Sequence, residues 1–221
     1  MLYSEKLPHF AAAHPCKTVT VDGANYRYIL EGNDNGKTLV FLNGGMVAQI
    51  YVQKYPGETG GLVLIATGGM DADTLKSLKK KYFLAPLMLW YMKHCNYEKL
   101  KPTLIKSGMS HIRDESAEEI AYAQDMFETI FKDFKQEKDV HISGLLADLM
   151  KQKPVTEADF AALEGKILLI LPSQDFFSEK MQNDLIKLMH APQISYVSGS
   201  HLSSVLKADD YIRTIREFLK K

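Results

Sequence analysis

Two residues in the C-terminal part of the chain, Asp175 and His201, are of the types that work together as an acid and a base. Each lies four residues after an apolar segment that is expected to form a strand, at 167–171 and at 194–197. The carboxyl ends of parallel strands meet at one edge of a sheet, where a carboxylate can orient an imidazole and stabilise its charged form. We therefore expect the two side chains to lie within hydrogen-bonding distance.

Simpler roles exist for both residues. An aspartate in a loop before a helix often caps that helix, although Ser178 is better placed to cap the helix expected at 178–189. A single histidine in a loop is most often a surface residue. The order of acid and then base, after two successive strands, favours the catalytic interpretation.

The residue that this base would activate is missing. No serine lies between Ser4 and Ser77, and a base without a hydroxyl or thiol to deprotonate cannot support nucleophilic catalysis. A serine in the acid or base loop would need a new oxyanion hole. The residues whose hydroxyl or thiol would have to replace the missing serine are Cys16, Thr67, Cys95, Ser173 and Ser200.

A glycine loop follows a buried strand in the N-terminal part. Residues 38–42 form the continuous apolar run of a strand that is buried on both faces of a parallel sheet. Asn43, Gly44 and Gly45 follow, and Met46 begins a segment of helical periodicity that ends at residue 55. The loop lacks the Lys-Ser/Thr pair of a phosphate-binding P-loop and the third glycine of a dinucleotide fingerprint.

The rest of the pattern predicts a β/α framework that a helical block interrupts. Strands at 18–21 and 26–30 predict an N-terminal hairpin, and a strand at 62–66 is expected to pair with 167–171. Residues 71–163 show only helical stretches, with a capping box at Ser116 and Glu119. The predicted organisation is a discontinuous α/β core, 1–70 and 164–221, with a helical cap at 71–163. The helices expected in the cap are 73–81, 83–94, 116–135, 143–151 and 156–163; a terminal helix is expected at 204–220.

The expected cap is rich in methionine and aromatic residues. At helical spacing such residues are typical of plain core, and in a lid over a strand-end site they line an apolar pocket. Those in its first part are Leu84, Leu87, Met88, Trp90, Tyr91 and Met92.

Composition narrows the class of protein. The 221 residues contain 27 Lys and Arg and 27 Asp and Glu, so no global field attracts nucleic acid or an anionic membrane. Cys16 and Cys95 form no metal-binding or disulfide pattern, which suits a reducing cytoplasm. The most apolar stretch, 82–92, is too short to span a bilayer, and the first twenty residues do not form a signal peptide. We expect a soluble cytoplasmic protein without cofactor, metal, nucleic-acid partner or membrane partner.

The chain resembles the α/β-hydrolase superfamily, and within it the capped small bacterial esterase and peptidase-like members. Residues 38–45 look like the strand and oxyanion loop of that family, with Asn43 where histidine is common. Residues 62–67 look like the strand after the nucleophile elbow, and 166–175 and 199–201 look like the acid and base loops. The resemblance covers nearly the whole chain. It implies an α/β-hydrolase fold with a mostly parallel sheet, and serine-type hydrolysis of a small apolar ester or amide.

The resemblance also implies roles for residues. Asp175 and His201 correspond to the acid and base of the catalytic triad. The residues that correspond to oxyanion-hole or substrate-binding positions are Asn43, Gly44, Gly45 and Met46.

In this resemblance, the single loop at Gly44 and Gly45 corresponds both to the oxyanion loop and to the nucleophile elbow of the family. Residues 44–51 also look like the helix that follows the Gly-x-Ser-x-Gly elbow. If Gly44 and Gly45 end the elbow, the serine position falls on Leu42; if they form the oxyanion loop, the elbow does not exist. A segment of roughly sixty to seventy residues that carries central strands and the nucleophile is therefore absent.

Three functions stay open at this point. The chain is an internally shortened serine-type hydrolase, inactive in this form; or it is a pseudoenzyme that binds a small apolar ligand under the cap. The third alternative is a partner-binding or self-associating module that uses an exposed sheet edge or the cap.

Overall fold

A computed structural model describes residues 1–21, 24–29, 45–112 and 114–220. Its central element is a parallel three-stranded sheet in the order β3 (Leu62–Ile65), β4 (Ile167–Gln174), β5 (Gln193–Ser200). Leu62 pairs with Ile167, which confirms the predicted pairing of these two segments. The strand predicted at 38–42 lies outside the described residues.

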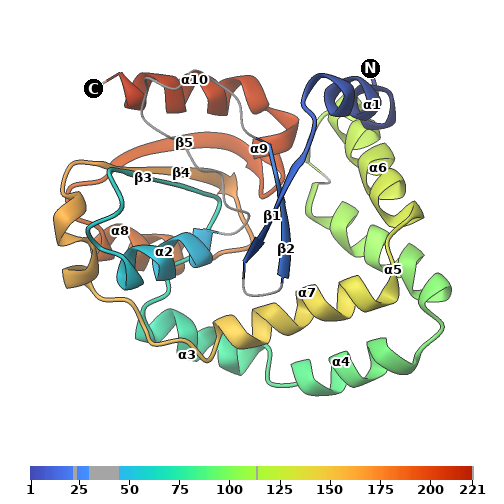
Figure 1. Cartoon of the computed structure of the whole chain (residues 1–221), viewed down its shortest axis with the longest axis horizontal. Helices are drawn as coiled ribbons and strands as arrows, with labels where there is room; N and C mark the ends of the chain where they lie inside the picture. The colour runs from blue at the N-terminus through green and yellow to red at the C-terminus, as the bar shows by residue number, and fades with distance from the viewer. Residues whose placement is uncertain (22–23, 30–44, 113, 221) are drawn as a thin grey trace.

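The middle strand, β4, is buried on both faces. Successive side chains of a strand point to opposite faces. Leu169 packs in one core with α2 (Gly45–Lys54), α3 (Ala72–Lys81) and α8 (Glu179–Leu188), whereas Leu168 packs in a second core with α10 (Ala208–Leu219). Figure 1 shows α10 over one face of the sheet and α2 and α8 over the other. The molecule therefore has the helix–sheet–helix layers of an α/β protein.

The described residues of 71–163 contain helices and no strand, as predicted. The Ser116–Glu119 capping box is present and begins α6. The division into a discontinuous core and a separate cap stays a prediction, so we call residues 71–163 the helical block. Besides α3, the block contains α4 (Ala85–His94), α5 (Tyr97–Met109), η1 (Ser110–Ile112), α6 (Ala117–Lys132), α7 (Gln136–Leu149) and η2 (Glu157–Leu163).

Several helices differ from the prediction. Pro8 and Pro102 lie inside α1 (Tyr3–Ala13) and α5, and neither helix was predicted. Proline disfavours a helix interior. Tertiary contacts overcome this preference in α1, where the Ser4 backbone N–H and hydroxyl both donate to Asp125 of α6, at 2.7 and 2.9 Å. The predicted terminal helix divides at Lys207 into α9 (Ser203–Leu206) and α10, and the helix predicted at 156–163 is a 3-10 helix.

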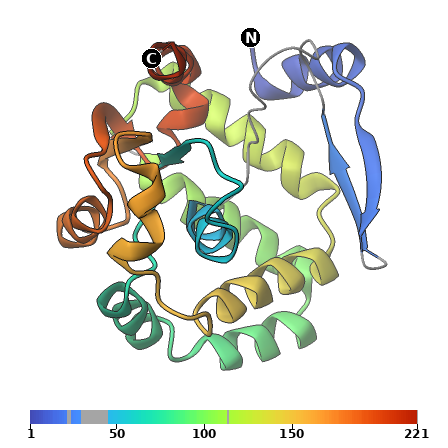
Figure 2. The same ribbon diagram turned by 60° about the vertical axis from the view of Figure 1, so that its left-hand side comes forward.

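The predicted N-terminal hairpin is present as a separate sheet. Strands β1 (Lys17–Val21) and β2 (Ala24–Tyr28) pair antiparallel, with Lys17 opposite Tyr28. Within the described part of the chain they pair with none of β3, β4 and β5. Figures 1 and 2 show the hairpin apart from the parallel sheet, on the side of the helical block.

Stability should depend on the two-faced burial of β4. Leu169 is fully buried, and Leu169→Ala should lower the free energy of unfolding by about 2–5 kcal/mol, because the truncation leaves a cavity. The matched control is Leu219→Ala, whose side chain is 42% exposed; it should change stability by less than about 1 kcal/mol. Urea denaturation measures both. Equal losses in the two variants would contradict the layered core.

Candidate active site

The register between β4 and β5 brings Asp175 and His201 together. Gln174 is opposite Ser200, after a register shift between Pro172 and Gln174. The next residues along these parallel strands, Asp175 and His201, therefore leave the sheet side by side at its carboxyl edge. His201 Nδ1 lies 3.0 Å from Asp175 Oδ1, which confirms the predicted contact.

The two strands run further than predicted. β4 continues to Gln174 and β5 to Ser200, so Asp175 and His201 follow their strands directly and not after four-residue loops. Pro172, which cannot donate to a sheet, lies within β4, and the irregularity beside it accommodates the residue.

Asp175 is an unusually buried carboxylate. Its side chain is 1% exposed, and Oδ1 also accepts from the Phe177 backbone N–H at 3.2 Å. Oδ2 is buried without a hydrogen-bond partner among the described residues. The helix cap belongs to Ser178, whose hydroxyl accepts from the Met181 N–H. Helix capping therefore does not account for the position of Asp175.

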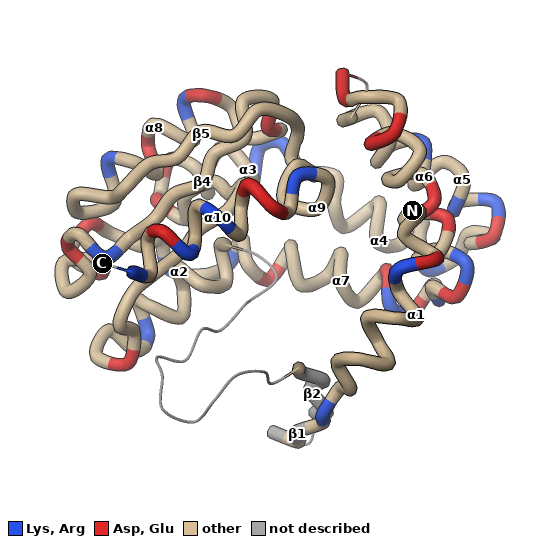
Figure 3. The backbone as a smooth tube through the Cα atoms, turned by 90° about the horizontal axis from the view of Figure 1, so that it is seen from above, with Lys and Arg blue, Asp and Glu red and all other residues tan. Residues whose placement is uncertain are grey.

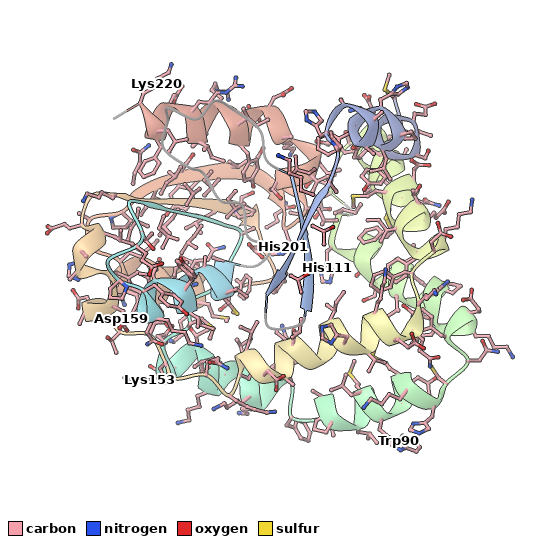
Figure 4. All side chains as sticks on the ribbon, viewed as in Figure 1. Trp90, His111, Lys153, Asp159, His201 and Lys220 are labelled. Carbon is pink, nitrogen blue, oxygen red and sulfur yellow. The ribbon has the colours of Figure 1, made fainter. Side chains whose placement is uncertain are left out.

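The contact with Asp175 orients the His201 ring. Because an ionised carboxylate can only accept a hydrogen bond, this contact with such a carboxylate requires a proton on Nδ1; in the neutral imidazole the lone pair is then on Nε2. The side chain is 34% exposed. Its ring centroid lies 4.3 Å from that of Phe176 and 6.1 Å from that of Phe177, which form an aromatic wall on one side. In Figure 4 His201 lies in the middle of the view, between the sheet and the helical block.

A buried carboxylate from the helical block holds the backbone just before His201. Glu115, 4% exposed, accepts from the Ser200 N–H at 2.7 Å and from Lys207 Nζ at 3.0 Å. Lys207 Nζ also donates to the Ser198 carbonyl at 2.9 Å. Gly199 has φ +116°, and a Cβ there would lie 2.7 Å from Glu115 Oε1. This cluster therefore requires glycine both for conformation and for space.

A second buried polar residue, Gln49, fixes the start of α2. Its Nε2 donates to the carbonyls of Gly45 and Gly68 at 3.2 and 3.0 Å, and its Oε1 accepts from the Met70 N–H at 3.0 Å. The side chain is fully buried. Gln49 therefore ties the first turn of α2 to the loop that follows β3.

Sequence reasoning missed both Glu115 and Gln49. The signal for Gln49 is one polar residue within the apolar segment 46–52, and Gly199 beside the base is the signal for close packing there. Neither signal identifies the partner, because both contacts join segments that are far apart in the chain.

Only part of the predicted oxyanion loop can be placed. Asn43 and Gly44 lie outside the described residues. Gly45 begins α2, and a Cβ on it would lie 2.6 Å from the Thr67 side chain just after β3. The start of α2 therefore lies at the carboxyl edge of the sheet, as does Asp175. The Met46 side chain is 8% exposed and packs in the core, so only its backbone is available to a ligand.

Three of the alternative nucleophiles, Thr67, Ser173 and Ser200, have structural hydrogen bonds. The Thr67 hydroxyl is buried and donates to the Gly68 carbonyl at 3.1 Å. The Ser173 hydroxyl accepts from the Gly199 N–H at 3.2 Å, and that of the fully buried Ser200 accepts from the Leu202 N–H at 3.3 Å. Within the described part of the chain, the His201 imidazole has the Asp175 carboxylate as its hydrogen-bond partner, and none of these three hydroxyls.

Two further groups near the site have shifted pKa values. Burial raises the pKa of Tyr211, against the effect of its 2.6 Å hydrogen bond with Ser203, and the charges of Asp175 and Glu115 raise it further. Tyr211 is therefore a neutral hydrogen-bonding group at ordinary pH. Hydrogen bonds from the Ser116 hydroxyl and backbone N–H lower the pKa of Glu119.

The described residues contain no group of three or more His, Cys, Asp or Glu side chains placed to hold a metal ion. None of the helices described has the length and apolar character that crossing a bilayer requires. An open groove with a volume of about 580 Å³ lies on the helical block, where the α4–α5 and α6–α7 connections meet, and neither Asp175 nor His201 lines it.

The layers and the parallel sheet make a partial α/β-hydrolase fold, and solved structures agree. The chain is similar to the enol-lactonase from Burkholderia xenovorans LB400, with a TM-score of 0.59 and 12% identity. It is also similar to a hydrolase from Pseudomonas aeruginosa PA01, with a TM-score of 0.57 and 14% identity, and to a thermophilic esterase from Thermogutta terrifontis, with a TM-score of 0.53 and 17% identity. These likenesses show the fold, which confirms the one that the resemblance implied.

The overlap with these structures is partial. Each comparison covers 80% of this chain but only 62%, 62% and 61% of the other chain, in the order given above. The sequence matches no protein-family model and no curated protein.

The Glu115 cluster should stabilise both the fold and the base. Glu115→Ala leaves the Ser200 N–H and the Lys207 ammonium without their acceptor, so the free energy of unfolding should fall by about 1–3 kcal/mol. The His201 imidazole resonances should also shift, because the preceding residue loses its anchor. Urea denaturation and NMR measure the two effects. The control is the exposed neighbour Glu118→Ala; identical behaviour of the two variants would contradict this role.

Proposed function

We propose that Asp175 and His201 are the acid and base of a serine-hydrolase-type site for a small apolar ester or amide, in a chain that lacks the nucleophile. The observation that carries this proposal is the 3.0 Å contact between His201 Nδ1 and the buried Asp175 carboxylate at the carboxyl edge of the sheet. The α/β-hydrolase fold supports it, because functional residues gather at that edge in such folds.

The proposed chemistry divides among the residues. His201 Nε2 accepts a proton from a hydroxyl, and Asp175 holds the imidazole in the required tautomer and stabilises its charged form. Backbone N–H groups near Gly44 and Gly45 would stabilise the oxyanion. The first N–H groups of a helix have no partner within it, and Gly45 begins α2.

The proposed inactivity follows from the nucleophile position. No serine lies between Ser4 and Ser77, and the hydroxyls of Thr67, Ser173 and Ser200 take part in structural hydrogen bonds. An internal shortening that removes the elbow accounts for this. Sequencing the gene across codons 40–50 tests whether that junction is genuine.

Activity assays test the proposal. The chain should show no labelling by a fluorophosphonate serine probe and no acyl-enzyme burst with an activated ester such as p-nitrophenyl acetate. Weak turnover from binding and oxyanion stabilisation can remain without a nucleophile. His201→Ala should therefore change the residual rate by less than about threefold, as should the control, the exposed His141→Ala.

Other outcomes separate the alternatives. Substantial turnover that His201→Ala abolishes and His141→Ala does not would reveal an unrecognised nucleophile and overturn the proposed inactivity. Negligible turnover together with thermal stabilisation by small apolar acids or esters would establish the pseudoenzyme. If neither ester turnover nor stabilisation is found, the partner-binding alternative takes its place.

A further inference from the structure

Helix α4 is apolar along nearly its whole length and is largely uncovered. Its sequence, Ala85–His94, contains no polar residue before Lys93. A helix that is apolar all round is normally buried, yet Met92 is the α4 residue that this structure buries. The exposed large side chains here are Phe83 (72%), Leu84 (51%), Leu87 (60%), Met88 (60%), Trp90 (59%) and Tyr91 (55%).

We call these six residues the α4 surface. The expectation that this segment forms plain core or lines a pocket is wrong for these side chains, because they face outward. Figure 4 shows Trp90 at the outer edge of the molecule, away from His201. The α4 surface therefore does not belong to the proposed active site.

The segment that carries the α4 surface is strongly basic. No acidic residue lies between Asp73 and Glu98, whereas this interval contains five lysines. Lys79, Lys80 and Lys81 form the last turn of α3, immediately before the α4 surface, and all three are exposed. Lys93 lies at its other end. Because the whole chain has a net charge of +0, this positive charge is concentrated locally.

The charges on the neighbouring helix cancel this field only in part. Helix α7 packs against α4 and carries three acidic residues. Asp148 pairs with Lys151 at 2.8 Å, whereas Asp139 accepts from the neutral Tyr97 hydroxyl at 2.9 Å, which does not compensate its charge. Glu137 is exposed, next to the exposed Lys138. In Figure 3 the tube of α4 is tan for most of its length.

We propose that the α4 surface, with Lys79, Lys80 and Lys81, binds the surface of an anionic lipid bilayer. Exposed Trp, Tyr, Phe and Leu next to lysines is the combination that places a helix in the interface of a membrane, where aromatic rings lie at headgroup level and ammonium groups meet lipid phosphates. Ten residues of α4 lie in the plane of such an interface without crossing it.

Two other occupants fit the surface less well. A second copy bound about a two-fold axis would place the five lysines of each chain close to those of the other, which is repulsive. Single-stranded nucleic acid would use the lysines and the aromatic rings, but Leu84, Leu87 and Met88 offer its bases no stacking partner. A lipid surface accommodates the charges and the aliphatic side chains together.

This inference is independent of the proposed function, and it departs from the expectation of no membrane partner. That expectation rested on the balanced total charge and on a segment too short to span a bilayer. Neither argument addresses a helix that lies on the surface of the bilayer.

Trp90 makes the experiment direct, because it is the only tryptophan in the 221 residues. The full chain is mixed with vesicles of phosphatidylcholine containing about 30% phosphatidylglycerol. Trp90 emission should shift to the blue and the protein should sediment with the vesicles. Binding should be at least about tenfold weaker with pure phosphatidylcholine, and weaker again at high salt.

Variants separate the apolar and basic parts of the surface. Phe83→Ser with Leu87→Ser should abolish the shift, and changing Lys79, Lys80 and Lys81 to Gln should remove the preference for anionic vesicles. The matched controls are Tyr196→Ser, a 69% exposed aromatic on β5, and a triple change to Gln at the exposed Lys153, Lys187 and Lys220. Both controls should bind as the unchanged chain does. Circular dichroism checks that each variant is folded.

Three results would overturn the proposal. The first is the absence of both the blue shift and sedimentation with anionic vesicles. The second is binding that survives in the Phe83 and Leu87 variant. The third is a response that fits another occupant. Trp90 emission that is already blue-shifted in buffer, together with a protein mass that rises with concentration, would assign the surface to a second copy. Emission that responds to single-stranded DNA and not to vesicles would assign it to nucleic acid.

Discussion

The parallel register between β4 and β5 is the constraint on which the candidate site depends. Gln174 opposite Ser200 makes Asp175 and His201 neighbours at the sheet edge. A slip of one residue would move every side chain of β4 to the other face. Such a slip would bury Leu168 and Ile170 in the core that now holds Leu169 and would also separate the acid from the base. The packing that stabilises the sheet therefore also fixes the geometry of the site.

Two unfavourable features lie at this same edge. Asp175 has a buried carboxylate oxygen without a partner among the described residues. Ala66, just after β3, has φ +46°, a conformation that costs a residue with a Cβ about 1 kcal/mol or more. Packing elsewhere offsets such costs, and their concentration at one place is typical of functional sites. This concentration of costs is compatible with the function proposed for the edge.

The sequence was sufficient for the framework and for the central pair. Continuous apolar segments at 62–66 and 167–171 predicted the paired strands, and the order of Asp175 and His201 after two strands predicted their contact. Helix ends with side-chain caps, such as Ser116 and Ser178, were also predictable because capping is local chemistry. The features that the sequence did not predict depend on contacts between segments that are far apart in the chain. Docking on α6 stabilises α1, and the partners of Glu115 and Gln49 come from segments that no local pattern links.

The α4 surface shows a different limit. Total charge and total apolar content are averages, and both are ordinary in this chain. What distinguishes the α4 surface is a local concentration of charge and of apolar area. Five lysines and six exposed apolar side chains lie in one stretch without an acidic residue. Helical periodicity shows that such residues share a helix, but only the structure shows that the packing against α7 leaves most of that helix uncovered. Whether an apolar helix is core or interface is therefore decided by its neighbours and not by its own sequence.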